Sequence, residues 1–364
     1  MNYEKNANKH YEYIVSAAKS HKNAENDLYY DAWLLYALCK YFSVCGKPAA
    51  YSEQIEKAVL APEKTFNACD AKSVKAYSVA AKALCLFAKT SSDDNAKKAA
   101  NKIFDLLIDG FYFTENERGE DTELAEAYCG AISAIADLYK NDKNKAVAFA
   151  MDNLRFFIDE KNYRFSDSES AFNGAIGLLL LSSCDASFLG AALTSGKKFA
   201  AMNGNLDYSF NLSFRENDTA DPVATSLAMN YYTILYKATG DRFFLYMARR
   251  IWFNAMQFFE RLGGFVGFNN PPCAPQGLLS IKTYKEEKRT PQFCEGLCAY
   301  EKNKELFAEY DAPVKKDPRG RYIVDDKVFA RELGEYFGRD LIEIPSLLSF
   351  DEETARGFKF KLLF

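Results

Sequence analysis

Carboxylates are the residues of this sequence best suited to chemistry. Asp218 and Asp221 lie just before a predicted helix, and Glu295 lies further along in the segment QFCEGLCAY. Two carboxyl groups that face each other across a groove can hydrolyse a glycosidic bond, one as acid and the other as base or nucleophile. We assign Asp218 or Asp221 as general acid or base and Glu295 as the facing carboxylate. Because Asp221 precedes Pro222, a structural helix cap is the competing and more common role for any single acid of this kind.

Aromatic and acidic side chains near the predicted loops are candidates for substrate binding. Trp33 is the preferred stacking platform, since flat apolar rings pack on the apolar faces of sugars. Asp31 lies close to it in the sequence, and we add Asp121, Tyr128 and Tyr208 to the binding set. Core packing is the competing explanation for at least half of the aromatic residues, and capping is the competing explanation for Asp121.

Metal and cofactor sites have little support. The two histidines both lie near the N-terminus, so neither a Ser-His-Asp triad nor a multi-histidine metal site is expected. Cys294 and Cys298 have a spacing that can bind zinc, but a site needs two further ligands, for which Cys273 and Asp221 are the evident candidates. Isolated cysteine pairs are more often packing residues. We expect no metal and no cofactor, with zinc as the weaker alternative, and no phosphate-binding glycine motif supports a nucleotide.

Composition excludes several partners. The 364 residues carry a net charge of −4 without a basic stripe, so we expect no nucleic acid partner. The longest apolar patch, 175–181, is far shorter than the ~20 residues that span a membrane. The first residues lack the apolar centre of a signal peptide, and the nine cysteines are scattered through helical patterns. We expect a cytoplasmic protein that binds a carbohydrate ligand, and leave its oligomeric state open.

Amphipathic helices dominate the chain. In the clearest pair, Asp221 caps a helix that ends at Gly240, and Asp241 caps the next. Ser166 and Glu169 have capping-box spacing. The periodicity predicts further helices, and strands are predicted at 279–283 and at the C-terminal end. The predicted helices cover residues 27–41, 52–60, 73–90, 96–108, 122–139, 145–158, 170–181, 222–238, 242–255, 295–310 and 326–337.

Helix pairs recur about every 40–50 residues, within the range of helical repeats. Long loops on alternate connections favour a closed ring over a linear solenoid, which would show a tighter consensus. We therefore predict an all-α fold, an α/α toroid of about six helix pairs with minor β-strands, in a single domain over residues 1–364. In such a ring the long loops open at one mouth, where the repeated acids are placed.

The central segment resembles a known family. The turn Thr239-Gly240-Asp241, a helix with Phe253-Asn254-Ala255, and the later cysteines Cys294 and Cys298 are similar to the bacterial β-L-arabinofuranosidase family, over roughly 218–310. The resemblance implies an α/α-toroid glycoside hydrolase. By spacing, Asp221 falls on the family's metal-binding Glu and Val223 on its Cys, so zinc and a cysteine nucleophile are not carried over.

The function predicted from these patterns is glycoside hydrolase-like action on an oligosaccharide by carboxylate acid/base chemistry. The alternative is a catalytically inactive toroid that serves as a sugar- or protein-binding module. A cyclase or lyase on a similar ring is a weaker third candidate, because the acid-rich motif of such cyclases is missing.

Overall fold

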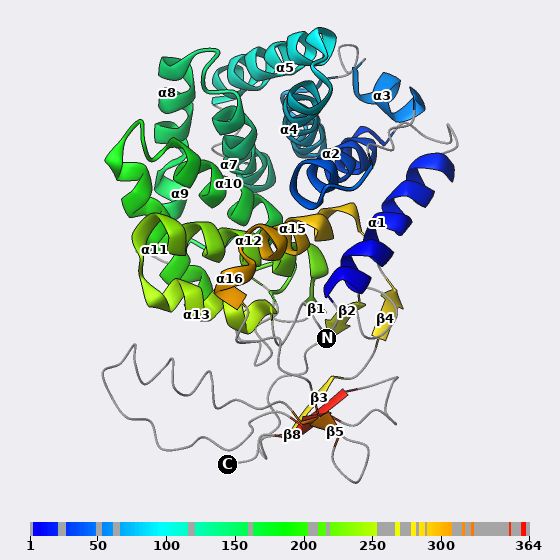
Figure 1. The fold of residues 1–364 in the computed structure, drawn as a ribbon. Coiled ribbons are helices and arrows are strands. Elements are labelled where there is room, and N and C mark those ends of the chain that lie inside the picture. Colours follow the sequence, from blue (N-terminus) through cyan, green and yellow to red (C-terminus); the bar gives the residue numbers. More distant parts are fainter. Residues whose placement is uncertain are drawn as a thin grey trace. The chain divides into compact units, whose positions relative to one another are not determined.

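The computed structural model is predominantly helical (Figure 1). It describes residues 3–20, 27–48, 53–60, 66–115, 121–158, 163–202, 210–215, 219–252 and 290–307, together with short strands at 266–269, 278–281, 284–287, 315–316, 322–323, 349–350 and 358–361. The chain divides into two compact units, residues 7–199 and residues 1–6 with 200–364. The single domain over 1–364 stays a prediction.

The unit of residues 7–199 is a series of helices. They are α1 (Tyr3–Ser20, from Ala7 on), α2 (Leu28–Cys45), α3 (Glu53–Leu60), α4 (Ala71–Ser91), α5 (Asp94–Phe113), α7 (Thr122–Asp137), α8 (Lys143–Asn153), α9 (Arg155–Ile158), α10 (Ser168–Leu181) and α11 (Ala186–Met202).

Alternate helices of this unit pack on one another. Helix α2 packs on α4, α4 on α7 and α7 on α10, while α5 pairs with α4 as its hairpin partner (Figure 1). Along the α7–α10 seam, Gly130 lies against Ser170 and Gly177 against Ile132 and Ser133, so the two helices run parallel. A Cβ at Gly177 would lie 2.5 Å from backbone atoms of α7, so glycine permits this close approach.

Aspartates determine where these helices begin. Asp27, Asp70, Asp121 and Asp167 are the N-caps of α2, α4, α7 and α10, and the side chain of each accepts a hydrogen bond from a backbone amide of the first turn. Such bonds satisfy amides that have no partner within the helix. Because α2, α4, α7 and α10 pack side by side and each starts at an aspartate, their N-terminal turns place acidic side chains near one another.

The second unit contains the predicted central pair. Helix α12 (Pro222–Thr239) begins at the N-cap Asp221 and ends at Gly240, whose φ of 70° is the left-handed conformation that glycine favours. Asp241 caps α13 (Arg242–Arg250), as predicted. Helix α12 also packs on α15 (Cys294–Lys302), which follows the short 3-10 helix η3 (Pro291–Phe293) and precedes α16 (Lys304–Phe307).

Short antiparallel strands complete this unit. β1 (Thr219–Ala220), β2 (Val266–Asn269) and β4 (Tyr284–Glu287) form a sheet in the order β1-β2-β4. A second sheet has the order β3-β8-β7-β6-β5 and comprises β3 (Leu278–Ile281), β5 (Lys315–Lys316), β6 (Tyr322–Ile323), β7 (Ser349–Phe350) and β8 (Phe358–Lys361). The strands predicted at 279–283 and in the C-terminal segment correspond to β3 and β8.

Four local predictions need correction or lie outside the described residues. The N-cap of α10 is Asp167, so Ser166 and Glu169 do not form the predicted capping box. The helices predicted at 145–158 and 295–310 are each divided in two, as α8 with α9 and α15 with α16. The helix predicted at 326–337 lies outside the described residues. Among the helices that the structure describes, none has an apolar stretch long enough to span a bilayer.

Candidate functional site

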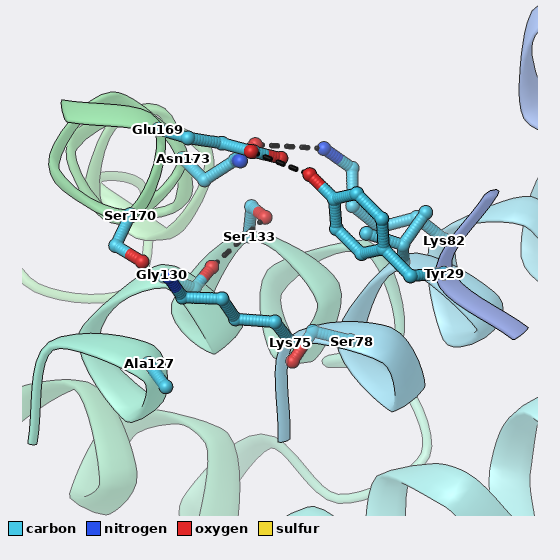
Figure 2. Close-up of a pocket in the computed structure, with 11 residues that line it drawn as sticks. Tyr29, Lys75, Ser78, Lys82, Ala127, Gly130, Ser133, Glu169, Ser170 and Asn173 are labelled. Atoms are coloured by element: carbon cyan, nitrogen blue, oxygen red, sulfur yellow. Dashed lines mark hydrogen bonds between the residues drawn. The ribbon is translucent and has the colours of Figure 1, made fainter. Parts of the chain in front are cut away.

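A small hollow with polar residues in its lining lies among α2, α4, α7 and α10 (Figure 2). Its volume is about 20 Å³, which is room for a water molecule. The residues that line it combine two lysines and a glutamate with hydroxyl and amide groups: Tyr29, Lys75, Ser78, Val79, Lys82, Ala127, Gly130, Ser133, Glu169, Ser170 and Asn173. Four helices therefore contribute polar groups to one small space.

Glu169 is the carboxylate of this hollow. It lies in the first turn of α10, and the hydroxyl of Tyr29 on α2 donates a hydrogen bond of 2.5 Å to its Oε2 (Figure 2). A hydrogen bond from a phenol to an ionised carboxylate is charge-assisted and fixes the position of both groups. Glu169 is thus held at the hollow by a residue 140 positions away in the sequence.

Lys82 brings a buried positive charge to the same hollow. The residue is 7% exposed, and its ammonium donates a hydrogen bond of 3.1 Å to Oδ1 of Asn173 on α10. The same ammonium lies 5.6 Å from the centre of the Trp33 ring and 5.3 Å from that of Tyr36. Cation–π contacts of this kind stabilise a desolvated ammonium. A buried lysine between α2, α4 and α10 is costly unless such groups surround it.

Lys75 has a different environment. Its ammonium forms an ion pair of 2.7 Å with Asp167, the N-cap of α10. Burial, the largest single influence, lowers the pKa of Lys75, but Asp167, Glu169 and Glu126 together outweigh it and raise that pKa above the ordinary 10.5. The positive charge of Lys75 is therefore balanced by a carboxylate in direct contact.

A buried glutamate on α7 holds the segment that precedes α10. Glu126 is fully buried, and its carboxylate accepts hydrogen bonds from the hydroxyl of Tyr163 at 2.9 Å, the amide and hydroxyl of Ser166, and the amide of Asp167 at 3.1 Å. These bonds fix the entry into α10. Glu126 thus fixes the positions of Asp167 and Glu169.

The structure places Asp221 and Asp121 at helix N-caps. The Asp221 carboxylate accepts a hydrogen bond of 2.9 Å from the amide of Ala224, and Asp121 accepts one of 3.0 Å from the amide of Leu124. Both residues therefore perform the structural role that was weighed against catalysis. Asp218 and Tyr208, the other acid and a proposed binding residue, lie outside the described residues.

Glu295 is buried beside α12. It is 1% exposed, and its Oε2 accepts a hydrogen bond of 2.8 Å from the side-chain amide of Asn230. Asn230 is nine residues after Asp221, which is ~13 Å along a helix axis. The carboxyl of Glu295 thus lies further along α12 than that of Asp221. Their roles as a catalytic pair stay a prediction.

The remaining predicted binding residues are in the core. Trp33 is 0% exposed, with Lys82 over its ring, and Asp31 is 1% exposed in the first turn of α2. Tyr128 is also buried, packs against Phe111 and Phe149, and donates a hydrogen bond of 3.0 Å to the carbonyl of Ala68. Trp33 is adjacent to the hollow through Lys82, whereas Tyr128 is part of the packing between helices.

The two cysteines proposed for zinc are buried, at 0% and 1% exposed. Cys294 and Cys298 lie on α15, one helical turn apart. In the part of the chain that the structure describes, no group of three or more His, Cys, Asp or Glu side chains is arranged to hold a metal ion. Cys273, the further candidate ligand, lies outside that part.

Sequence reasoning missed most residues of the site, among them Lys82, Glu126 and Glu169. Two of them carried a signal. Lys82 interrupts the apolar run SVAAKALCLFA and Glu126 interrupts LAEAYCGAISAIA. A helix that is apolar on every side is buried, so a single charge within it must have buried partners. Glu169 was noticed only as a cap residue, and its contact with Tyr29 across 140 positions has no local signal.

Comparison with known proteins gives structural likenesses and no sequence match. No protein-family model matches the chain, and no curated protein matches it either. A GH76 α-mannanase from Bacteroides thetaiotaomicron has a TM-score of 0.54 at 12% identity, over 84% of this chain and 96% of that one.

Two further solved structures are similar to the chain. A cellobiose 2-epimerase from Bacillus thermoamylovorans has a TM-score of 0.51 at 15% identity, over 75% of this chain and 86% of the epimerase. An inactive variant of an α-1,6-mannanase from a Salegentibacter species, solved with α-1,6-mannotriose, has a TM-score of 0.52 at 12% identity, over 84% and 100% of the two chains.

These likenesses concern the fold. Together with the alternating helices they confirm the predicted class, an all-α fold of the α/α-toroid type. The solved structures with this fold include proteins named as mannanases and as an epimerase, and the likeness does not single out the arabinofuranosidase family. A shared fold does not by itself assign an activity.

Proposed function

We propose that this chain is a carbohydrate-active protein of the glycoside hydrolase-like toroid class, and that its ligand is a saccharide. The observation that carries the proposal is the polar hollow, where Glu169, Tyr29, Lys82 and Asn173 converge from three helices. A carboxylate with donors and acceptors around it suits hydroxyl-rich ligands, since each sugar hydroxyl both donates and accepts. The structural neighbours named for mannanase and epimerase activity support the same class.

In this proposal Glu169 is the first candidate for the proton-transfer group. Its hydrogen bond with Tyr29 holds the carboxylate in place and offers a second group that can carry a proton. Asp218, Asp221 and Glu295 stay in the proposal as the carboxylates predicted from the sequence, with Asp31, Asp121, Trp33, Tyr128 and Tyr208 as the predicted binding set. The partial resemblance of 218–310 to arabinofuranosidases supports a glycosidase more than an epimerase.

The test is hydrolysis and isomerisation of a panel of oligosaccharides, with products separated by chromatography. Glu169→Gln is expected to lower the rate by roughly 10²–10⁴-fold if this carboxylate transfers a proton. Glu123→Gln is the matched control, because Glu123 is exposed and occupies the same position in α7, two residues after the N-cap. An unchanged rate in Glu169→Gln would transfer the catalytic role to the other carboxylates, which are tested as Asp218→Asn, Asp221→Asn and Glu295→Gln.

A binding module without catalysis is the second candidate. The helix-capping bond of Asp221 favours it, because this predicted catalytic acid has a structural role. Saccharides that bind yet are recovered unchanged would establish this alternative. A panel that neither binds nor reacts would overturn both candidates.

A further inference from the structure

We propose that the hollow selects neutral sugars over acidic ones by receiving one hydroxyl group between Lys82 and Glu169. This inference rests on the proposed function and adds the class of ligand and the residues that determine it. Three features of the hollow support this inference: the charges that line it, the hydrogen-bonding capacity of these groups, and its size.

The charges at the hollow sum to zero once Asp167 is included. Lys75 forms an ion pair of 2.7 Å with Asp167 and also interacts with the charge of Glu169, so Lys75, Lys82, Asp167 and Glu169 contribute two positive and two negative charges. Lys82 and Glu169 are a positive and a negative group on two sides of the hollow, which Lys75 also lines (Figure 2). An acidic ligand in the hollow would be attracted by Lys82 and repelled by Glu169, so neither sign of charge is favoured. A neutral polar ligand avoids that conflict.

The hydrogen-bonding groups suit a hydroxyl. The ammonium of Lys82 carries three N–H donors, one of which is used by Asn173. The ionised carboxylate of Glu169 has two oxygens with about four lone-pair sites, and Tyr29 donates to Oε2. A sugar hydroxyl can accept from the first and donate to the second at the same time. An ether oxygen or a methyl group can do at most half of this.

The volume decides how much of the ligand enters. About 20 Å³ holds a group of the size of a water molecule, whereas a sugar ring is several times larger. We infer that one hydroxyl enters while the ring stays at the opening. A site built to bond a hydroxyl rejects the analogue without it, because its buried polar groups lose their partners.

Trp33 offers a reporter for occupancy. The chain has two tryptophans, and the ammonium of Lys82 lies 5.6 Å from the ring centre of Trp33. In a Trp252→Phe background, Trp33 fluorescence reports changes around Lys82. The probes are cellobiose and α-1,6-mannotriose as neutral sugars and trigalacturonate as the acidic one, with calorimetry as an independent measure of affinity.

We expect at least one neutral probe to bind about tenfold or more tightly than trigalacturonate, and to change Trp33 fluorescence saturably. Glu169→Gln should reduce that preference about tenfold, because it removes the repulsion of the acidic probe and leaves Lys82. Lys82→Met should weaken the neutral probe about tenfold. The matched controls Glu123→Gln and Lys72→Met, both exposed first-turn residues of α7 and α4, should leave affinity and preference unchanged.

The outcomes separate this inference from the proposed function. Neutral and acidic probes that bind equally, or a preference that survives in Glu169→Gln, would overturn the selection mechanism while carbohydrate binding stands. Binding without a response of Trp33 would place the ligand elsewhere. Absence of binding to any probe or panel sugar would overturn the proposed function and the inference with it. Because Lys82 is buried, the result for Lys82→Met counts only if the variant has a native circular dichroism spectrum. If it does not, the result for Glu169→Gln alone decides.

Discussion

The N-terminal turns of α10 and α12 start in the same way and are used differently. Asp167 and Asp221 both cap their helices through backbone amides. At α10, Asp167 also pairs with Lys75, and Glu169 two residues later meets Tyr29 from α2. At α12, Pro222 follows the cap, and the nearby buried carboxylate, Glu295, is bonded to the neutral amide of Asn230.

The difference shows that the capping aspartate does not make a site by itself. What distinguishes the α10 end is the set of charged and phenolic groups that α2, α4 and α7 bring to it. Glu126 is central to this set, because it holds the segment from which Asp167 and Glu169 project. Substitutions at these two helix ends, and at the seam between α7 and α10, test this difference.

Removal of Glu126 should have the largest effect. Glu126→Ala leaves the amides of Ser166 and Asp167 and the hydroxyl of Tyr163 without their buried acceptor. Loss of one partner of a buried charged network costs roughly 3–5 kcal/mol. Urea denaturation should show this fall in the free energy of unfolding, against less than ~0.5 kcal/mol for the exposed Glu123→Ala. A loss below ~1 kcal/mol would show that Glu126 does not hold the α10 end.

Gly177→Ala tests the close seam that brings α7 and α10 together. The added methyl would meet the backbone of Ile132 and Ser133 at 2.5 Å, so the helices must separate, at a cost of roughly 1–3 kcal/mol. Gly190→Ala on α11 is the control, since nothing lies within 4 Å of its added methyl. There the helix propensity of alanine should stabilise by up to ~1 kcal/mol. Equal effects of the two substitutions on thermal unfolding would contradict the close packing.

Asp221 can be tested for capping and chemistry separately. Asp221→Ala should cost roughly 0.5–2 kcal/mol through the lost bond to Ala224, while Asp221→Asn keeps a side-chain oxygen and should be close to neutral. Denaturation measures the stability of both variants, and the oligosaccharide assay measures the turnover of Asp221→Asn. If Asp221→Asn is stable but has no turnover, the catalytic role proposed for Glu169 on α10 belongs to the N-terminal end of α12 instead.

The ion pair of Lys75 and Asp167 should give the smallest effect. The pKa of Lys75 is raised in the folded chain, so its contribution is fully present below the unfolded pKa near 10.5 and is lost as pH rises through the higher folded value. Because the lysine side chain is 34% exposed, Lys75→Met should lower the free energy of unfolding by less than ~1 kcal/mol. Denaturation from pH 7 to pH 11 should show a constant difference in the free energy of unfolding between the unsubstituted protein and Lys75→Met. This difference should shrink only above about pH 10.5. A difference that shrinks below pH 9 would contradict the assignment.

Local rules predicted much of the fold. Asp221, Pro222 and Gly240 each act on the backbone within a few residues, so their positions revealed the start and end of α12. Apolar periodicity revealed most of the other helices. The divisions after Asn153 and Lys302 were not predicted, because apolar periodicity gave no indication of where these helices are interrupted.

The site was less predictable, because it depends on contacts between distant segments. Trp33 and Tyr128 have the residue types of a binding surface, yet tertiary packing buries both. Lys82 and Glu126 could have been suspected from their apolar surroundings. The contact of Tyr29 with Glu169 follows only from the packing of α2, α4, α7 and α10, for which the sequence offers no pairwise signal.

Because Glu126 accepts hydrogen bonds from the segment before α10, it also couples the local unfolding of α7 to that of the start of α10. The amides of Ser166 and Asp167 precede α10, yet their hydrogen bonds go to a side chain of α7. These amide protons can exchange with solvent only when that carboxylate withdraws. They should therefore exchange at the slow rate of the α7 interior rather than at the fast rate of a connecting segment, so that α7 and the entry to α10 open as one cooperative unit.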